Sequence, residues 1–330
     1  MVKLAILGAG RIGGVHARNA AAHRAIDLVA ISDPVAASAK SLAEQTGAAV
    51  ESVDTVLADA RIEAVIVATP TDTHADLTER AAAAGKAVFC EKPIDLDAAR
   101  VQACLRAVER AGVPLFVGFN RRFDPSFAAL RNRLFDGEVG KLEILTITSR
   151  DPSPPPLSYI TRSGGLFRDM MIHDFDMACW LLGEAPIEVY ATAAALVDPA
   201  IGAAGDVDTA AVILKTASGA MCQISNSRRA VYGYDQRIEA HGSTGMLLAD
   251  NRRSTTVVCA GSGGYTQDPA ENFFLERYAD AYRLELDAFV QCLDTGAAPE
   301  PGGADGLRAL ELADAAVQSA RTGNAIAVSI

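Results

Sequence analysis

Three polar residues in one segment have the types and spacing of an acid–base site. Asp169, His173 and Asp176 fall at positions i, i+4 and i+7 of a predicted helix from about Gly165 to Leu182, and this spacing places side chains on one helical face. A carboxylate one turn from an imidazole can orient the ring, and histidine, with an unperturbed pKa of about 6.5, suits removal of an alcohol proton. A solvated stripe of charge is the alternative; the apolar flanking residues argue against it because they predict a mostly buried helix.

A lysine at the end of a predicted strand is the second chemical candidate. The apolar run Ala87–Cys90 is followed by Glu91, Lys92 and Pro93. At the carboxyl edge of a parallel sheet, the Lys92 ammonium would point into the ligand crevice, where it could hold a substrate hydroxyl and stabilise a developing alkoxide. Pro93 restricts Lys92 to extended backbone. A surface lysine that merely ends a strand is the alternative.

The N-terminal segment carries a nucleotide-binding pattern. The letters G-A-G-R-I-G follow an apolar run, and Asp33 ends the next apolar run twenty positions after Gly13. In such a βαβ unit Gly8 permits the tight turn, Gly10 lets the backbone approach a pyrophosphate, and Gly13 lets the helix pack close to the sheet. An ordinary strand-to-helix turn is the alternative, and it leaves Asp33 unexplained.

Asp33 also predicts which dinucleotide is bound. Its carboxylate can accept hydrogen bonds from the adenosine ribose hydroxyls, whereas a 2′-phosphate would meet its negative charge. The next residues, Pro34 and Val35, supply no compensating cation. The sequence therefore favours NAD over NADP.

These candidates need a scaffold, and the first third of the chain predicts one. Strand-like runs alternate there with helix-forming segments, which is the rhythm of a doubly wound parallel sheet that binds ligand at the carboxyl ends of its strands. Asp95 is predicted to cap a helix from about Leu96 to Glu109. The predicted strands are Val2–Leu7, Ile26–Ser32, Ala64–Ala68, Ala87–Cys90 and Pro114–Gly118.

After about Asn120 the pattern changes, and short turns separate several consecutive strands, which predicts an open, mainly antiparallel sheet. The helix that carries His173 would cover one face, and the other face is a candidate for pairing with a second subunit. We therefore predict a nucleotide-binding domain over residues 1–120 and a substrate-binding and oligomerisation domain over residues 121–330. The predicted strands are Leu142–Ser149, Ile187–Leu196, Thr209–Thr216, Ala220–Ser225, Asp235–His241, Gly245–Ala249 and Thr255–Cys259, with further helices at Pro125–Phe135, Phe273–Leu293 and Ala304–Ala320.

Composition excludes several functional classes. The 330 residues are 50% hydrophobic and 22% charged, and no uninterrupted apolar run approaches the roughly 20 residues needed to span a bilayer. The N-terminus leads straight into a strand and not into a signal segment, which predicts the cytoplasm. A net charge of −11 without a basic tract predicts no nucleic-acid partner. Six widely spaced cysteines without a C-x-x-C pattern predict neither a metal cluster nor disulfides.

Several motifs together resemble the Gfo/Idh/MocA family of oxidoreductases, and within it the inositol 2-dehydrogenases. The resemblance spans nearly the whole chain and implies a Rossmann domain, an α/β domain with an open sheet, and a tetramer. The motifs are the glycine pattern, Thr69–His74, Glu91–Pro93, Gly118–Pro125, Gly164–Asp176 and Tyr232–Arg237.

The resemblance also implies residue roles. The implied catalytic residues are Lys92, Asp169 and His173. The implied NAD contacts are Gly8, Gly10, Arg11, Ile12, Gly13, Asp33, Thr69, Pro70, Thr71, His74, Glu91, Lys92 and Arg122. The implied contacts with a polyol substrate are Lys92, Asp151, Asp169, His173 and Tyr232, with Asp176 as a further candidate.

The implied activity is NAD-dependent oxidation of myo-inositol at one ring hydroxyl to 2-keto-myo-inositol. His173, assisted by Asp169, would take the hydroxyl proton, and Lys92 would hold the reacting oxygen. Another cyclitol or aldose, such as scyllo-inositol or glucose, and a non-catalytic NAD sensor remain alternatives. A short-chain dehydrogenase is excluded because no tyrosine has a lysine four positions later, and the cysteine spacing argues against a zinc alcohol dehydrogenase.

Overall fold

The computed structural model describes residues 1–329, and the chain forms two compact units. One unit comprises Met1–Asn120 and Ala281–Leu310, and the other comprises Arg121–Asp280 and Glu311–Ile330. The segment 281–310, which the sequence analysis assigned to the second domain, therefore packs with the first unit. Independent domains over 1–120 and 121–330 stay a prediction.

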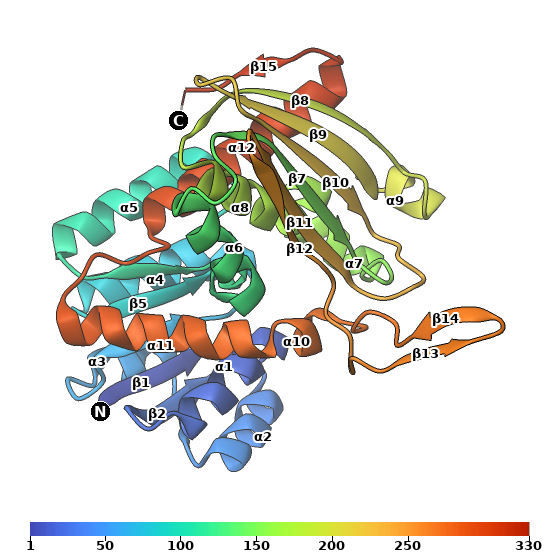
Figure 1. The fold of residues 1–330 in the computed structure, drawn as a ribbon. Helices are drawn as coiled ribbons and strands as arrows, with labels where there is room; N and C mark the ends of the chain where they lie inside the picture. Colours follow the sequence, from blue (N-terminus) through green and yellow to red (C-terminus); the bar gives the residue numbers. More distant parts are fainter. Residues whose placement is uncertain (330) are drawn as a thin grey trace. The chain divides into compact units, whose positions relative to one another are not determined.

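The first unit is built on a six-stranded sheet whose neighbouring strands are all parallel (Figure 1). The chain leaves the sheet centre in opposite directions from β1 and β4, and this is the switch point beside which doubly wound sheets bind ligands. The predicted Rossmann-type sheet is confirmed, with one short strand, β3, that was not predicted. In spatial order the strands are β3 (Ala49–Val50), β2 (Ile26–Ser32), β1 (Val2–Leu7), β4 (Ala64–Val67), β5 (Ala87–Glu91) and β6 (Leu115–Gly118).

Aromatic packing explains why a late helix belongs to the first unit. Phe289 of α11 (Ala279–Thr295) lies with its ring centroid 5.6 Å from that of Phe89 and 5.8 Å from that of Phe116. All three side chains are buried. The other helices of this unit are α1 (Arg11–Ala22), α2 (Ala36–Thr46), α3 (Val53–Ala58), α4 (His74–Ala83), α5 (Ala98–Ala111) and the short 3₁₀ helix η1 (Thr71–Thr73).

The cap predicted for α5 was wrong by two residues. Asp97 is the N-cap, and its side chain accepts a hydrogen bond of 2.8 Å from the Ala99 amide. Asp95 instead accepts from the Asp97 amide at 3.0 Å. Both aspartates are typical of helix starts, so composition alone could not choose between them.

The second unit is built on a seven-stranded sheet (Figure 1). All neighbouring strands are antiparallel except β7 and β10, which pair in parallel. The predicted open, mainly antiparallel sheet is confirmed. In spatial order its strands are β12 (Gly245–Ala249), β11 (Asp235–Gly242), β7 (Leu142–Arg150), β10 (Met221–Ser227), β9 (Thr209–Thr216), β8 (Pro186–Ala194) and β15 (Ile326–Ala327).

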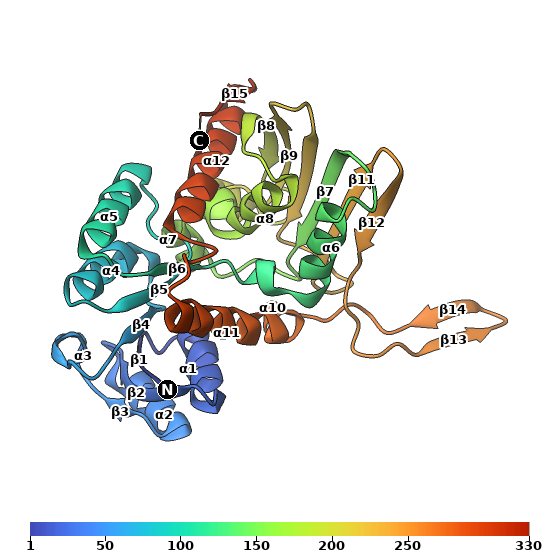
Figure 2. The same cartoon turned by 60° about the vertical axis from the view of Figure 1, so that its left-hand side comes forward.

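One face of this sheet is covered by helices, which lie in front of the strands in Figure 2. The helix α6 packs against β12 and the helix α8 against β7. In β9, Val212 and Leu214 point to the covered face and are fully buried, while Ile213 between them is 40% exposed. The helices of this unit are α6 (Pro125–Phe135), α7 (Leu157–Ser163), the π-helical segment η3 (Leu166–Met170), α8 (Ile172–Leu182), α9 (Pro199–Ala203), α10 (Phe274–Arg277) and the greater part of α12 (Gly303–Thr322), with the 3₁₀ turn η2 (Asn120–Phe123) at the unit boundary.

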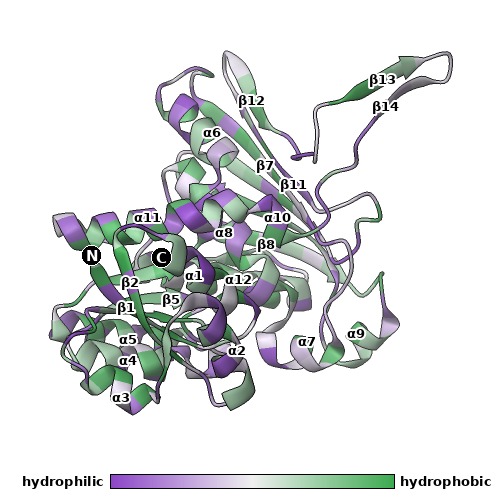
Figure 3. Ribbon diagram, turned by 90° about the horizontal axis from the view of Figure 1, so that it is seen from below, coloured by the Kyte–Doolittle hydropathy of each residue, from purple (hydrophilic) through white to green (hydrophobic). Residues whose placement is uncertain are grey.

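Two predicted elements were wrong in the last third of the chain. The predicted strand Thr255–Cys259 does not join the large sheet; β13 (Val258–Gly261) pairs only with β14 (Gly264–Gln267) in an exposed hairpin that projects from the second unit (Figure 3). The predicted helix Phe273–Leu293 is interrupted at Tyr278, between α10 and α11. None of the helices within residues 1–329 is long and apolar enough to cross a bilayer.

Candidate active site

The turn after β1 has the shape of a dinucleotide cradle. Gly8 has a φ of +108°, and a Cβ at this position would lie 2.5 Å from the carbonyl oxygen of Ala68. A Cβ at Gly13 would lie 1.9 Å from the carbonyl oxygen of Gly8, whereas one at Gly10 would meet nothing within 4 Å. The turn therefore needs glycine at two positions for its own packing and leaves open space at the third, beside the first amides of α1, where a pyrophosphate fits.

Asp33 is joined to this turn from the end of β2. One carboxylate oxygen accepts a hydrogen bond of 2.6 Å from the Ala9 amide, and the other accepts one of 2.7 Å from the Val35 amide. A carboxylate has about four lone-pair sites, so both oxygens can still accept ribose hydroxyls. The residues after it, Pro34 and Val35, are exposed and uncharged, as the argument for NAD requires.

The loops after β4 and β5 are connected by a histidine. The two ring nitrogens of His74 each lie 2.8 Å from a backbone carbonyl oxygen, one that of Pro93 and the other that of Thr69. His74 is buried, so the structure shows it positioning the loop that carries Lys92. A direct contact between His74 and a cofactor stays a prediction.

Glu91 takes part in a contact that the sequence analysis missed. Its carboxylate lies 2.7 Å from Nε2 of His16, a residue of α1 that is fully buried. The pair connects the glycine-turn helix to the strand that precedes Lys92. The sequence indicated this pair only weakly: His16 is a polar residue among the glycines and alanines on the buried face of α1.

The structure brings twelve of the predicted cofactor residues to one edge of the first unit. They lie in the turns and first helical residues that follow the carboxyl ends of β1, β2, β4 and β5, which are neighbours in one parallel sheet. Lys92 is half-buried there, directly after β5. These residues are Gly8, Gly10, Arg11, Ile12, Gly13, Asp33, Thr69, Pro70, Thr71, His74, Glu91 and Lys92, whereas Arg122 belongs to the second unit.

In the second unit, the predicted single helix from Gly165 to Leu182 was wrong. Residues 166–170 form a π-helical segment, in which the Met171 amide donates to the Leu166 carbonyl, and α8 begins only at Ile172. The chain enters this segment through Gly165, whose φ of +79° is in the left-handed region. Such π-helical turns are frequent at functional sites. Asp169 therefore lies in the π-helical segment and not in the regular helix α8.

His173 is the accessible residue of a buried stretch. Every residue from Met170 to Ala178 is buried except His173, which is half-buried, and Asp169 just before this stretch is also half-buried. Asp169 and His173 are therefore the two residues of the predicted triplet that stay partly exposed. The sequence analysis predicted from the apolar flanking residues that this helix is mostly buried, and the structure agrees.

Asp176 differs from Asp169 and His173. Its two carboxylate oxygens accept hydrogen bonds of 2.8 and 2.5 Å from Nε and Nη2 of Arg122, and both side chains are buried. The sequence analysis predicted that Asp169, His173 and Asp176 share one helical face. In the structure Asp176 is buried, unlike the other two, because it forms an internal ion pair with Arg122. The same contact places the Arg122 guanidinium inside the second unit, and its predicted contact with NAD stays a prediction.

Asp169 has partners on both of its carboxylate oxygens. Oδ1 accepts a hydrogen bond of 2.9 Å from the Tyr159 hydroxyl, and Oδ2 lies 3.7 Å from Nη2 of Arg228. The pKa of the neighbouring Asp151 is raised to about 6, chiefly by desolvation; the Arg228 and Arg121 charges oppose this rise, and the Asp169 charge adds to it. The predicted substrate residues Asp151 and Asp169 therefore lie in one electrostatic environment around Arg228.

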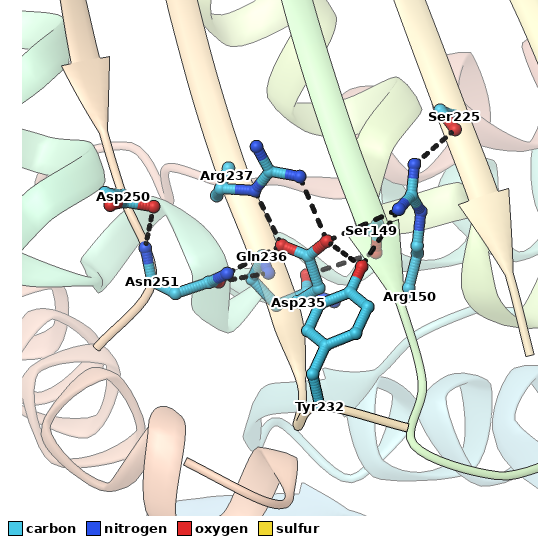
Figure 4. A network of polar contacts seen from close by, with 9 residues as sticks. All are labelled: Ser149, Arg150, Ser225, Tyr232, Asp235, Gln236, Arg237, Asp250 and Asn251. Atoms are coloured by element: carbon cyan, nitrogen blue, oxygen red, sulfur yellow. Dashed lines mark hydrogen bonds and ion pairs between the residues drawn. The ribbon is translucent and has the colours of Figure 1, made fainter. Parts of the chain in front are cut away.

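Tyr232 lies in a separate polar network at the end of β11 (Figure 4). Its hydroxyl donates a hydrogen bond of 2.7 Å to Asp235 and accepts one of 2.9 Å from Arg150. Burial and the bond to Asp235 raise the pKa of the Tyr232 phenol. The side chain is 49% exposed, so it has a free surface, and its contact with a substrate stays a prediction.

The comparisons with known proteins agree on one family across both units. Residues 2–119 match the oxidoreductase family with an NAD-binding Rossmann fold, and residues 127–248 match the GFO/IDH/MocA C-terminal domain. The chain belongs to the Gfo/Idh/MocA family of oxidoreductases. The family, the fold and the NAD-binding domain predicted from sequence are thereby confirmed.

Individual relatives cover nearly the whole chain. An inositol 2-dehydrogenase of Rhizobium meliloti (strain 1021) is 56% identical over 96% of each sequence. The crystal structure of a myo-inositol dehydrogenase from Corynebacterium glutamicum matches with a TM-score of 0.96 at 46% identity, covering 100% of this chain and 99% of that one. A scyllo-inositol dehydrogenase from Lactobacillus casei, solved with NAD(H) and scyllo-inositol bound, matches with a TM-score of 0.92 at 29% identity over 99% of each chain.

Proposed function

We propose that this protein is an NAD-dependent inositol 2-dehydrogenase that oxidises myo-inositol to 2-keto-myo-inositol. The observation that carries the proposal is similarity over almost the full length to proteins named inositol 2-dehydrogenase and myo-inositol dehydrogenase. Lys92, Asp169 and His173 are all present in this chain. Two matching proteins named for scyllo-inositol are 36% and 29% identical to this chain, below the 56% and 46% of the two relatives just cited, which favours myo-inositol over scyllo-inositol as the substrate.

The first unit supplies the residues that would hold NAD. The open space at Gly10 and the first amides of α1 suit the pyrophosphate, and Asp33 suits the adenosine ribose. When bound, NAD⁺ supplies the acceptor for the hydride that leaves the substrate carbon.

The chain's own residues would handle the proton and the oxygen. His173 takes the proton of the reacting hydroxyl, and Asp169 stabilises the imidazolium that results. The Lys92 ammonium holds the same oxygen while negative charge develops on it, and the oxygen ends as the ketone carbonyl. That one residue of the first unit and two of the second act on the same hydroxyl is part of the proposal.

The test is NADH formation by the purified protein with myo-inositol, scyllo-inositol and glucose. We expect the highest kcat/KM with myo-inositol and loss of turnover in Lys92→Ala and His173→Ala. A matched control is Lys40→Ala, whose side chain is 75% exposed and belongs to α2. NAD binding without turnover of any of these polyols would support the sensor alternative instead.

The proposal includes a homotetramer that assembles through the uncovered face of the seven-stranded sheet. Large apolar side chains on this face are between 40% and 54% exposed, and such a patch on a soluble protein marks an interaction surface. Light scattering in solution measures the expected mass of four chains. The residues are Ile144, Ile187, Tyr190, Ile213, Met221, Met246 and Leu248.

A cytoplasmic location also belongs to the proposal. All six cysteines are free thiols in the structure, as is usual in a reducing compartment. Cell fractionation followed by immunodetection checks this location.

A further inference from the structure

A buried arginine beside Asp169 has no role in the mechanism given above. Arg228 directly follows β10, is 1% exposed, and is held by a hydrogen bond of 2.8 Å from its backbone amide to the Asp208 carbonyl. Its Nε and Nη2 are buried and make no hydrogen bond within residues 1–329. Burying a guanidinium is costly unless an opposite charge compensates it, so the carboxylates beside it must account for its presence.

The nearest of these carboxylates is a catalytic candidate. Oδ2 of Asp169 lies 3.7 Å from Nη2 of Arg228, while Tyr159 donates to Oδ1 from the other side at 2.9 Å. The three side chains come from different elements: Tyr159 from α7, Asp169 from the π-helical segment, and Arg228 from the end of β10. The Asp169 carboxylate therefore has a hydrogen bond on one oxygen and a buried cation near the other, from two separate elements, and both favour one orientation of the group.

We propose that Arg228 and Tyr159 are positioning residues of the dehydrogenase reaction, which hold the Asp169 carboxylate in the orientation and charge state from which it assists His173. The inference rests on the proposed function. Neither residue touches the reacting atoms in this role, since both act through Asp169.

The charge of Arg228 has a second consequence, which involves Asp151. Desolvation and the Asp169 charge raise the pKa of Asp151, and Arg228 and Arg121 oppose this rise. Two other titratable groups act on this pair: the Asp174 charge also raises the pKa of Asp151, and Tyr159 donates to Asp169. His173 follows Asp169 by four positions in the chain. Removing the Arg228 charge would leave Asp151 with one opposing cation fewer, so protonation of the Asp151 carboxyl would extend to higher pH.

The experiment is a set of double-mutant cycles through Asp169. Tyr159→Phe, Arg228→Lys and Arg228→Met are each made alone and in the Asp169→Asn background, and kcat and KM for myo-inositol are measured across pH. We expect Arg228→Met to lower kcat by about 10- to 100-fold, because it removes the buried positive charge beside the Asp169 carboxylate, and Tyr159→Phe to lower it by about threefold, because it removes one hydrogen bond. In the Asp169→Asn background the same changes should cost less than about twofold, because residues that act through one group are not additive.

Two further readouts separate positioning from a general structural role. Arg228→Lys should recover most of the kcat lost in Arg228→Met because it restores the charge. The acid limb of kcat/KM should move to higher pH in Arg228→Met but not in Tyr159→Phe, since only the former removes a positive charge. The matched control is Arg229→Met, an exposed neighbour, which should behave as the wild type. Calorimetric titration with NAD⁺ should give an unchanged affinity in every variant.

Several outcomes would overturn the inference. It fails if losses in the Asp169→Asn background equal those in the wild type, or if Arg228→Met keeps its acid limb and its kcat. Should Arg228→Met not fold, as thermal unfolding would show, the Tyr159→Phe and Arg228→Lys cycles decide by the same criterion, because Tyr159 is 49% exposed and lysine keeps the charge. An inactive wild-type protein would overturn both this inference and the proposed function, whereas an active wild type with additive losses overturns the positioning role alone.

Discussion

At the scale of single residues, the candidate catalytic side chains differ from their neighbours in accessibility more than in type. The segment around His173 holds three aspartates, and two of them, Asp174 and Asp176, are buried against Arg121 and Arg122. Only Asp169 stays partly exposed, with 13% of its side chain accessible, and His173 is also partly exposed. Charge spacing in the sequence identified the helix, but it could not tell which carboxylate was already used by an arginine more than 50 positions earlier.

The role predicted for Asp33 in cofactor preference can be tested at this one residue and its neighbour Val35. We expect Asp33→Ser combined with Val35→Arg to raise the ratio of kcat/KM for NADP to that for NAD by about 10- to 100-fold, because the change removes a repulsion and adds a charge-assisted contact. Val35 is 58% exposed, so the arginine needs no repacking. The control is Val35→Ala, and an unchanged ratio in the double variant would contradict the role given to Asp33.

The Asp235 network makes a pH-dependent contribution to stability (Figure 4). Burial alone would raise the pKa of Asp235, but hydrogen bonds from Arg237, Asn251 and Tyr232 hold it below the ordinary value of 3.8. A carboxyl with a lowered folded-state pKa adds stability that is fully present above the unfolded-state pKa and is lost as pH falls through the folded-state value.

Asp235→Asn should therefore lower the free energy of unfolding by about 3 kcal/mol near neutral pH, with a gap that narrows below about pH 4. Urea denaturation at several pH values measures this difference. Asp54→Asn, which removes a carboxylate that is 88% exposed, should change stability by less than about 0.5 kcal/mol. A gap for Asp235→Asn that stays constant with pH would contradict the assignment.

At the scale of elements, the apolar periodicity and the turn residues at segment ends were sufficient to predict several regular helices and strands. The predicted bounds of β1, β2, β9 and β12 agree with the structure, as do those of α6. These elements have a clear apolar period and glycine, proline or aspartate at their ends. The π-helical segment could not be predicted in this way, because it begins at a glycine with positive φ, Gly165, next to a hydrogen bond from the Leu166 amide to Asp206, a residue 40 positions later in the chain.

That contact gives a prediction at the same scale. A Cβ at Gly165 would lie 2.4 Å from Oδ1 of Asp206, which accepts the Leu166 amide at 3.1 Å, and the residue also has a positive φ. Gly165→Ala should destabilise the protein by about 2 kcal/mol or more and lower kcat, because it disturbs the segment that carries Asp169.

The matched control is Gly205→Ala, where φ is +84° but no atom lies within 4 Å of the added Cβ. This variant should lose about 1 kcal/mol from backbone strain alone and keep its kcat. Thermal unfolding and steady-state kinetics of the two variants measure the comparison. Equal effects of Gly165→Ala and Gly205→Ala on kcat would show that the packing at Gly165 does not position Asp169.

At the scale of the whole molecule, the exposed sheet face determines the expected assembly. Ile213→Lys places a charge in the centre of the apolar face of the second unit, and we expect it to reduce the mass measured by light scattering. Val50→Lys makes the same chemical change at a position of the first unit that is 48% exposed, and it should leave the mass unchanged. An unaltered mass for Ile213→Lys would show that the chains associate elsewhere.

The division of the chain into two units could be predicted only in part, because it depends on packing between residues that are far apart in the sequence. The composition change near Asn120 coincides with one boundary between the units. The return of residues 281–310 to the first unit depends on Phe289 meeting Phe89 and Phe116, and nothing local in the sequence of α11 distinguishes such a helix from one that belongs to the second unit. The His16–Glu91 pair was missed for the same reason.

This discontinuity bears on any attempt to transplant the nucleotide-binding half. A fragment truncated after Asn120 would lack Phe289, so the rings of Phe89 and Phe116 would be exposed to water. Such a fragment would be prone to aggregate. A usable graft would have to splice two separate stretches of the gene, and recombination during evolution would have faced the same obstacle.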